Sequence, residues 1–166
     1  MQLPPFLRGE VPGVLPQVSL WLRNLEEVEE MIARWAGDLG PEGFWWVPGP
    51  EMNPIGGLVR HIGRSSYRLF LRGTAQEIPE TLRTSAHDEM SPSDRHPEEV
   101  LRETRDLLQD VRQGLAALRA ADLEREASMG GARVRAAYLF DHLSTHASHH
   151  AGQIIVTRKL WNARRA

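Results

Sequence analysis

The chain has 166 residues, of which 41% are hydrophobic and 25% charged, so it is long enough to bury a hydrophobic core and its composition excludes an intrinsically disordered chain. It contains no cysteine, which excludes disulfides and thiolate ligands, so any metal ion must be held by His, Asp or Glu. The net charge of −2, with arginines interleaved among acids, disfavours nucleic-acid binding, and no apolar run reaches the roughly 20 residues of a membrane span. We therefore expect a single cytoplasmic domain over residues 1–166, without a secretory signal.

An apolar residue recurs every three or four positions after Pro16, which predicts a helix over residues 15–38. The next segment, GDLGPEGFWWVPGPEMN, combines Gly and Pro with three aromatic side chains and predicts a packed connecting loop. Trp45 and Trp46 in this loop are expected to cover one end of the core, with a place in a substrate pocket as the alternative.

Asn53 and Pro54 are typical of a helix start, and the apolar spacing after them predicts a second helix over residues 54–72. From Gly73 to Pro97 there is no helical period and turn-forming residues are frequent. This segment is predicted to be a long connection, a feature that is often functional in a compact domain.

A third helix is predicted over residues 97–122, with acids in its first turn, where they suit the helix dipole. The Gly-rich break SMGGA follows, and a last helix is predicted over residues 133–162. No segment alternates with a period of two, so no strand is expected. The predicted fold class is all-α, a four-helix bundle with a long connection between helices two and three.

Four of the seven histidines lie within the stretch DHLSTHASHHAGQ. His142, His146 and His150 are four residues apart, so they share one face of the helix, and two imidazoles at this spacing can bind one cation. His149 lies beside this stripe. Because such pairs also occur on solvated helix faces, a metal site requires a further ligand from another helix.

His61 is the candidate for that ligand, because it lies in the second helix among apolar neighbours. Gly57 and Gly63 on the same helix would let a neighbouring segment approach closely. The alternative is a buried histidine that is satisfied by one hydrogen bond.

The segments GGLVRHIG and HASHHAGQI together resemble the DinB-like (damage-inducible) superfamily of metal-dependent four-helix-bundle proteins. The resemblance implies a divalent metal ion, Zn²⁺ or Ni²⁺, with three ligands: His61, His146 and His150. His142, His149 and Gln153 are then neighbours or motif members, and a pair formed by His142 and His146 is the alternative on the last helix. The chain departs from the family pattern at Ala151, where an arginine is frequent, and the resemblance also implies a homodimer.

A three-histidine site leaves a metal ion its full charge and open positions, which is typical of catalytic sites. The resemblance extends to thiol S-transferases, which implies transfer of a low-molecular-weight thiol such as bacillithiol or mycothiol to a small electrophilic substrate. Because the chain has no cysteine, that thiol must arrive with the substrate. A metal-dependent hydrolase and a stress-response metal-binding module without turnover are the alternatives. Asp141, Glu89 and His149 are equal candidates for a general base.

Overall fold

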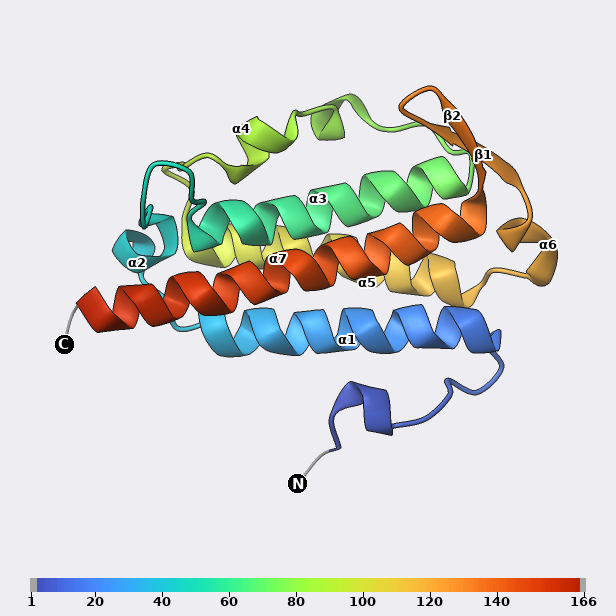
Figure 1. The fold of residues 1–166 in the computed structure, drawn as a ribbon, viewed down its shortest axis with the longest axis horizontal. Helices are drawn as coiled ribbons and strands as arrows, with labels where there is room; N and C mark the ends of the chain where they lie inside the picture. Colours follow the sequence, from blue (N-terminus) through green and yellow to red (C-terminus); the bar gives the residue numbers. More distant parts are fainter. Residues whose placement is uncertain (1–2, 165–166) are drawn as a thin grey trace.

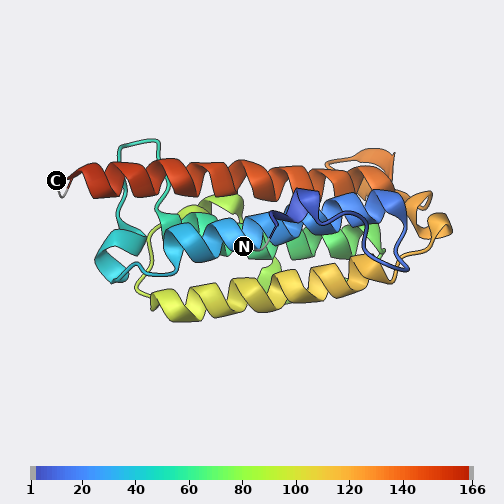
Figure 2. The same ribbon diagram turned by 90° about the horizontal axis from the view of Figure 1, so that it is seen from below.

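The computed structural model describes residues 3–164, in which four long helices run side by side along the longest axis of the molecule (Figure 1). They are α1 (Pro16–Ala36), α3 (Ile55–Gly73), α5 (Pro97–Ala116) and α7 (Ala136–Arg164). α1 and α7 run in one direction, and α3 and α5 run in the other (Figures 1 and 2). This arrangement confirms the all-α four-helix bundle expected from the sequence.

Each long helix buries an apolar face in a common core, where full burial of one large apolar side chain contributes about 1.5–3 kcal/mol. The largest apolar side chains that are fully buried are Leu25, Phe44, Ile55, Leu58, Ile62, Leu108, Leu115, Phe140, Leu143 and Ile154. α3 and α5 approach closely at Gly63, because a Cβ atom there would lie 2.9 Å from the Cα of Thr104. The Thr104 hydroxyl donates to the carbonyl of Val59 at 3.0 Å and joins the two helices.

The long connection between α3 and α5 follows from their shared direction. α3 has 19 residues and is about 28 Å long, so the chain must return along that length before α5 begins. The returning segment contains η2 (Glu80–Leu82) and α4 (Ala86–Met90), and it lies along the outside of α3 (Figure 1). The connection was expected from the sequence. Its two short helices were not, because they are too short to show a repeating apolar pattern.

α4 is held against the first turns of α3. A Cβ atom at Gly57 would lie 2.2 Å from the carbonyl oxygen of Met90, so only glycine allows this approach. The Arg60 guanidinium donates to the carbonyls of Asp88, Glu89 and Ser91 at 3.0, 2.7 and 2.8 Å. These contacts place the side chains of α4 beside the middle of α3.

The expectation that the chain contains no strand is wrong. β1 (Glu126–Met129) and β2 (Ala132–Arg135) form an antiparallel hairpin, in which Ala127 is paired with Val134. Gly130 and Gly131 connect the strands with φ values of +59° and +82°, as a two-residue hairpin turn requires. Strands of four residues are too short to establish a period of two.

Two helix boundaries differ from the prediction, one of them because of the hairpin. It occupies the first residues of the predicted last helix, so α7 begins at Ala136. α5 ends at Ala116, earlier than predicted, and the chain continues through α6 (Ala120–Leu123). The other boundaries agree with the predicted helices to within two residues.

Short helices lie at the periphery of the bundle: η1 (Pro5–Leu7) beside α1 and α2 (Pro41–Trp45) at one end (Figure 1). The Trp45 indole donates to the carbonyl of Arg95 at 2.8 Å, and the rings of Trp46 and Trp161 lie 5.5 Å apart. These tryptophans therefore pack at the end of the bundle. Within residues 3–164, no helix combines the length and the apolar character needed to cross a membrane.

Candidate metal centre

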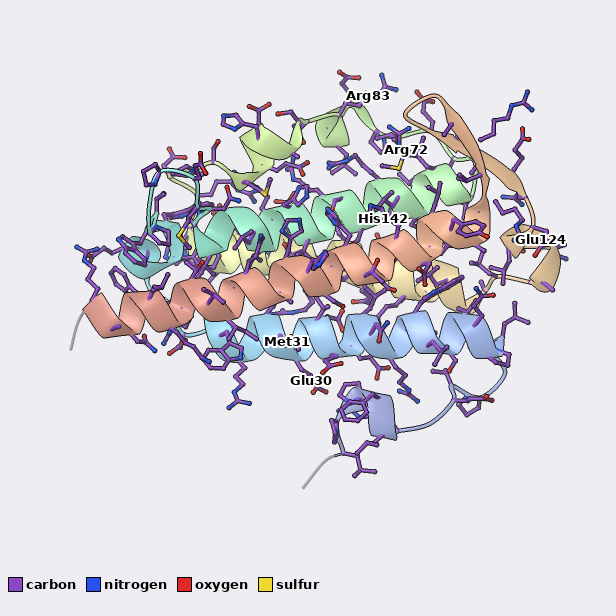
Figure 3. The ribbon with its side chains drawn as sticks, in the orientation of Figure 1. Glu30, Met31, Arg72, Arg83, Glu124 and His142 are labelled. Atoms are coloured by element: carbon purple, nitrogen blue, oxygen red, sulfur yellow. The ribbon has the colours of Figure 1, made fainter. Side chains whose placement is uncertain are left out.

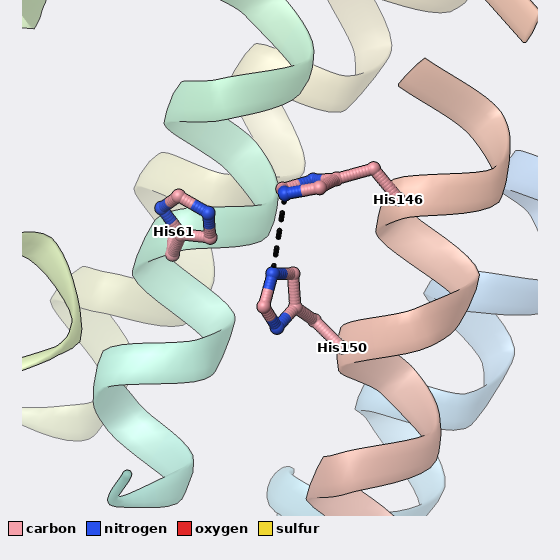
Figure 4. A group of neighbouring side chains, drawn as sticks. All are labelled: His61, His146 and His150. Carbon is pink, nitrogen blue, oxygen red and sulfur yellow. Dashed lines mark hydrogen bonds between the residues drawn. The ribbon is translucent and has the colours of Figure 1, made fainter. Parts of the chain in front are cut away.

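Three histidines converge between α3 and α7 (Figure 4). His61 extends from α3 and is buried, whereas His146 and His150 occupy successive turns of α7 and are half-buried. Each of the three offers one ring nitrogen, and these nitrogens all lie within 4.8 Å of one another. His61 and His146 are 85 positions apart in the chain, so the antiparallel packing of α3 against α7 creates the group.

The spacing of the two nitrogens on α7 fits a metal ion. The Nε2 atoms of His146 and His150 lie 3.3 Å apart. Two nitrogens bound tetrahedrally to one zinc ion at 2.0–2.1 Å would be about 3.3 Å from each other. Imidazole nitrogen is also a donor that zinc, nickel, copper and iron accept. The three donors and the spacing of this pair thus suit a divalent transition-metal ion.

Hydrogen bonds hold the Nδ1 side of each ring and leave the Nε2 atoms of His146 and His150 facing one another (Figure 4). The Nδ1 atom of His61 lies 2.8 Å from the Glu89 carboxylate, and that of His150 lies 2.7 Å from Oε1 of Gln153. The Nδ1 atom of His146 lies 3.4 Å from the hydroxyl of Ser65. The Glu89 carboxylate and the Gln153 carbonyl oxygen only accept hydrogen bonds, so the Nδ1 atoms of His61 and His150 carry the proton and their Nε2 atoms keep a lone pair. The Ser65 hydroxyl can donate to Nδ1 of His146, whose Nε2 can then donate to Nε2 of His150 at 3.3 Å. A bound metal ion would take the place of that proton.

Glu89 is itself held by several donors. Its carboxylate accepts hydrogen bonds from the Arg68 guanidinium and the Thr84 hydroxyl, in addition to the one from His61. Burial alone would raise the pKa of Glu89, but these hydrogen bonds outweigh it and lower the pKa to about 2. The side chain therefore stays ionised at neutral pH and acts only as an acceptor. Because it is buried and engaged with His61, it is poorly suited to be the general base.

The two converging histidines of α7, His146 and His150, have lowered pKa values and are neutral at neutral pH. Burial is the largest cause that lowers the pKa of His146, to about 4, and the nearby imidazoles of His150, His61 and others add to it. Burial also lowers the pKa of His150, although its hydrogen bond with Gln153 acts in the opposite direction. Neutral imidazole is the form that binds a metal ion, so protons do not compete for these nitrogens at pH 7.

The remaining candidates from the sequence lie around this group. His142 is exposed on α7 (Figure 3), with its ring 5.4 Å from that of His146, and it is not one of the three nitrogen donors that converge. His149 is exposed on the same helix, and Gln153 is the partner of His150. Asp141 accepts a hydrogen bond from Trp21 of α1 at 3.1 Å, so it faces a different helix from the one that carries His61.

Sequence reasoning named Gln153 as a motif member and Glu89 as a candidate base, but it missed Ser65 and Arg68 and the orienting role of Glu89. Ser65 and Arg68 follow His61 by four and seven positions, so all three share one face of α3. This spacing could have been recognised in the sequence. Glu89 had no such signal, because it lies in the crossover and reaches His61 only through the path of the chain.

The model of the DinB superfamily matches residues 24–154, which include all three converging histidines. No protein with a curated description matches this chain. The solved structures that share the fold at low sequence identity include the following three.

A conserved protein from Enterococcus faecalis is 13% identical, with a TM-score of 0.71 over 87% of this chain and 96% of its own. YfiT from Bacillus subtilis, described as a probable metal-dependent hydrolase with an unusual four-helix bundle topology, is 15% identical, with a TM-score of 0.65 over 92% of this chain and 94% of its own. YjoA, a DinB-like protein from Bacillus subtilis, is 17% identical, with a TM-score of 0.58 over 86% of this chain and 90% of its own. Since the family model covers most of the residues, the chain belongs to the DinB superfamily.

Proposed function

We propose that the protein is a divalent-metal-dependent enzyme in which His61, His146 and His150 are the ligands, and that it transfers a low-molecular-weight thiol to an electrophilic substrate. The observation that carries this proposal is the convergence of three imidazole nitrogens within 4.8 Å. Three neutral ligands leave the full charge of a divalent ion, which would lower the pKa of a thiol or water molecule bound at an open position. Zn²⁺ and Ni²⁺ are the ions that we propose.

The thiol is favoured over water because the one carboxylate in contact with the described histidines is not available as a proton acceptor for the nucleophile. Glu89, the carboxylate that contacts the group, is buried and engaged with His61 and Arg68. A thiol has a pKa near 8.5 and water one of about 15.7, so a thiol needs far less help to ionise at neutral pH. The sulfur would then bond to an electrophilic carbon, the leaving group would depart with its electron pair, and the thiol proton would pass to solvent.

The chain itself supplies no sulfur nucleophile, because it contains no cysteine. The thiol must therefore be a second substrate, such as bacillithiol or mycothiol. His146 and His150 are half-buried, so their side of the group remains open to small molecules. His61, by contrast, lies on the buried side and is locked by Glu89.

A metal-dependent hydrolase is the second candidate, and the description of YfiT favours it. The same three histidines would serve, with water in place of the thiol. Incubating the zinc-loaded and nickel-loaded protein with bacillithiol and a chlorinated electrophile should give the conjugate only when the thiol is present. Ester or amide cleavage without thiol would contradict the transferase and favour the hydrolase, and metal binding without either activity would favour the stress-response binding module.

The ligand set is tested separately by elemental analysis. The wild type should contain about one zinc or nickel ion per chain, and the His61→Ala, His146→Ala and His150→Ala variants should lose it. His142→Ala is the matched control, because His142 is exposed on the same helix face. Unchanged metal content in His150→Ala, or a loss in His142→Ala as large as in the ligand variants, would contradict the proposed set. The homodimer and the single-domain organisation remain predictions.

A further inference from the structure

A cleft of about 300 Å³ lies between α3, α7 and the loop that precedes α3. Three apolar side chains line it: Met52, Leu58 and Val156. Leu58 is buried, but Met52 and Val156 remain 39% and 54% exposed. Cavities that bind small molecules start at about this volume and are lined mainly by apolar groups. The cleft therefore suits one small apolar arm of a ligand.

The cleft begins one helical turn from the three histidines. Leu58 precedes His61 by three residues on α3, and Gln153 follows His150 by three residues on α7. Because the two helices are antiparallel, both steps lead toward the same end of the bundle, by about 4.5 Å along the axis. Gln153 lines the cleft and also binds Nδ1 of His150 at 2.7 Å, so the two sites share a wall.

The lining of the cleft along α7 begins with two polar side chains beside His150, those of His149 and Gln153, and ends with Val156 and Thr157. Along α7, Gln153 is nearer to His150 than Val156 is, so the polar amide lies at the inner end. Glu51 also lines the cleft and would repel a negatively charged arm. A ligand that fits both ends has a polar group toward the histidines and an uncharged apolar arm beyond it.

Gly152 keeps the cleft open. It lies within α7, where glycine is among the least favourable residues, and a Cβ atom built there meets no atom within 4 Å. Neither backbone conformation nor close packing therefore requires a glycine at this position. A larger side chain would extend into the cleft without disturbing the helix.

We propose that this cleft binds the uncharged apolar arm of the electrophilic substrate, while the polar reacting group of that substrate lies at the three histidines. The placement of the reacting group at the three histidines rests on the metal centre proposed above. Gly152 is then a specificity-determining residue, because the part of the cleft next to Gly152 limits the length of the arm that can bind.

The test measures the affinity of the zinc-loaded protein for straight-chain hydroxamic acids, from acetohydroxamic to octanohydroxamic acid, by calorimetry. The hydroxamate group binds zinc, so the change in affinity with each added methylene measures how well the chain is bound by the cleft. Full burial of a methylene strengthens binding about fourfold, and an open cleft that covers roughly half of the chain should give about twofold per methylene. In Gly152→Leu this increase in affinity per methylene should disappear, while acetohydroxamic acid should bind as it does to the wild type.

Gly152→Ala should give an intermediate result, and Lys159→Leu, which adds the same side chain at an exposed position of α7 outside the cleft, should behave as the wild type. Affinities that are independent of chain length in the wild type, or equal gains in wild type and Gly152→Leu, would overturn the cleft proposal while leaving the metal centre intact.

If acetohydroxamic acid fails to bind, the metal centre is wrong, and the cleft is tested on the metal-free protein. Hexanamide, added to protein labelled with ¹³C at the methionine methyl groups, should then shift the Met52 signal, which is assigned through Met52→Leu. The same titration should leave that signal unchanged in Gly152→Leu. No shift in the wild type would overturn the proposal.

Discussion

The Nδ1 atom of His61 lies 2.8 Å from the carboxylate of Glu89, which the crossover brings from 28 positions further along the chain. This pair fixes the orientation and the tautomer of the buried imidazole, and carboxylates that orient metal-binding histidines typically change metal affinity 10- to 100-fold when they are removed. The crossover therefore does more than connect α3 to α5, because it supplies a residue that prepares a candidate ligand.

Glu89→Gln should lower zinc affinity by about 10- to 100-fold, because the amide has the same size but lacks the charge that polarises His61 and pairs with Arg68. Competition with a chromophoric chelator measures this loss. Glu103→Gln is the matched control, since Glu103 also pairs with arginines, Arg64 and Arg95, and does not contact the three histidines. Equal affinities in wild type and Glu89→Gln would show that the carboxylate does not support the ligand.

Two Gly→Ala substitutions should have opposite effects on stability. Gly57→Ala places a Cβ atom 2.2 Å from the Met90 carbonyl oxygen, so α4 must shift at a cost of about 1–3 kcal/mol, and Glu89 moves with it. Gly152→Ala meets no neighbour and should raise the free energy of unfolding by up to about 1 kcal/mol. Urea denaturation measures both changes.

The same two substitutions distinguish an effect on stability from an effect on metal binding. Gly57→Ala should also weaken zinc binding, because it displaces the partner of His61, whereas Gly152→Ala should leave zinc affinity unchanged. A Gly57→Ala protein as stable as the wild type would mean that α4 does not lie tightly against α3.

The metal-free protein should lose stability in two stages as the pH falls. The pKa of His146 is about 4 in the folded state and 6.5 ordinarily, so the unfolded chain takes up this proton first. The contribution of neutral His146 to the free energy of unfolding is fully present above about pH 6.5 and is lost as the pH falls toward 4. For Glu89, with a pKa lowered from 4.5 to about 2, the corresponding loss runs from about pH 4.5 to 2.

Urea midpoints between pH 7 and pH 3 would record this decline. His146→Gln should flatten the portion between pH 6.5 and 4, because glutamine does not titrate, and His87→Gln, at an exposed position of α4, should leave it unchanged. A profile with the same slope in His146→Gln and wild type would contradict the assignment.

Zinc should stabilise the folded protein through the three histidines. A ligand that binds only the folded state adds about 2.7 kcal/mol at a free concentration of 100 times its Kd. Thermal unfolding with buffered zinc should therefore show a higher Tm, which a chelator reverses. His150→Ala should show no increase under the same conditions, and His142→Ala should keep it; a zinc-dependent rise in His150→Ala would contradict the role of that residue.

Local information was sufficient for most of the secondary structure. The four long helices were predictable because an apolar face must repeat every three or four residues wherever a helix packs on a core. The hairpin around Gly130 and Gly131 and the early end of α5 were not, because four-residue strands and single helical turns are shorter than any period that can be recognised.

By itself the sequence determined the chemistry that was present: an HxxxH pair on the last helix, one histidine among apolar neighbours on another, and no cysteine. Only the tertiary structure decided that His61 meets His146 and His150, that His142 stays outside this group, and that Glu89 and Ser65 orient the rings. The physical reason is that helix spacing sets which residues share a face, whereas the direction of the helices and the path of the crossover set which faces meet.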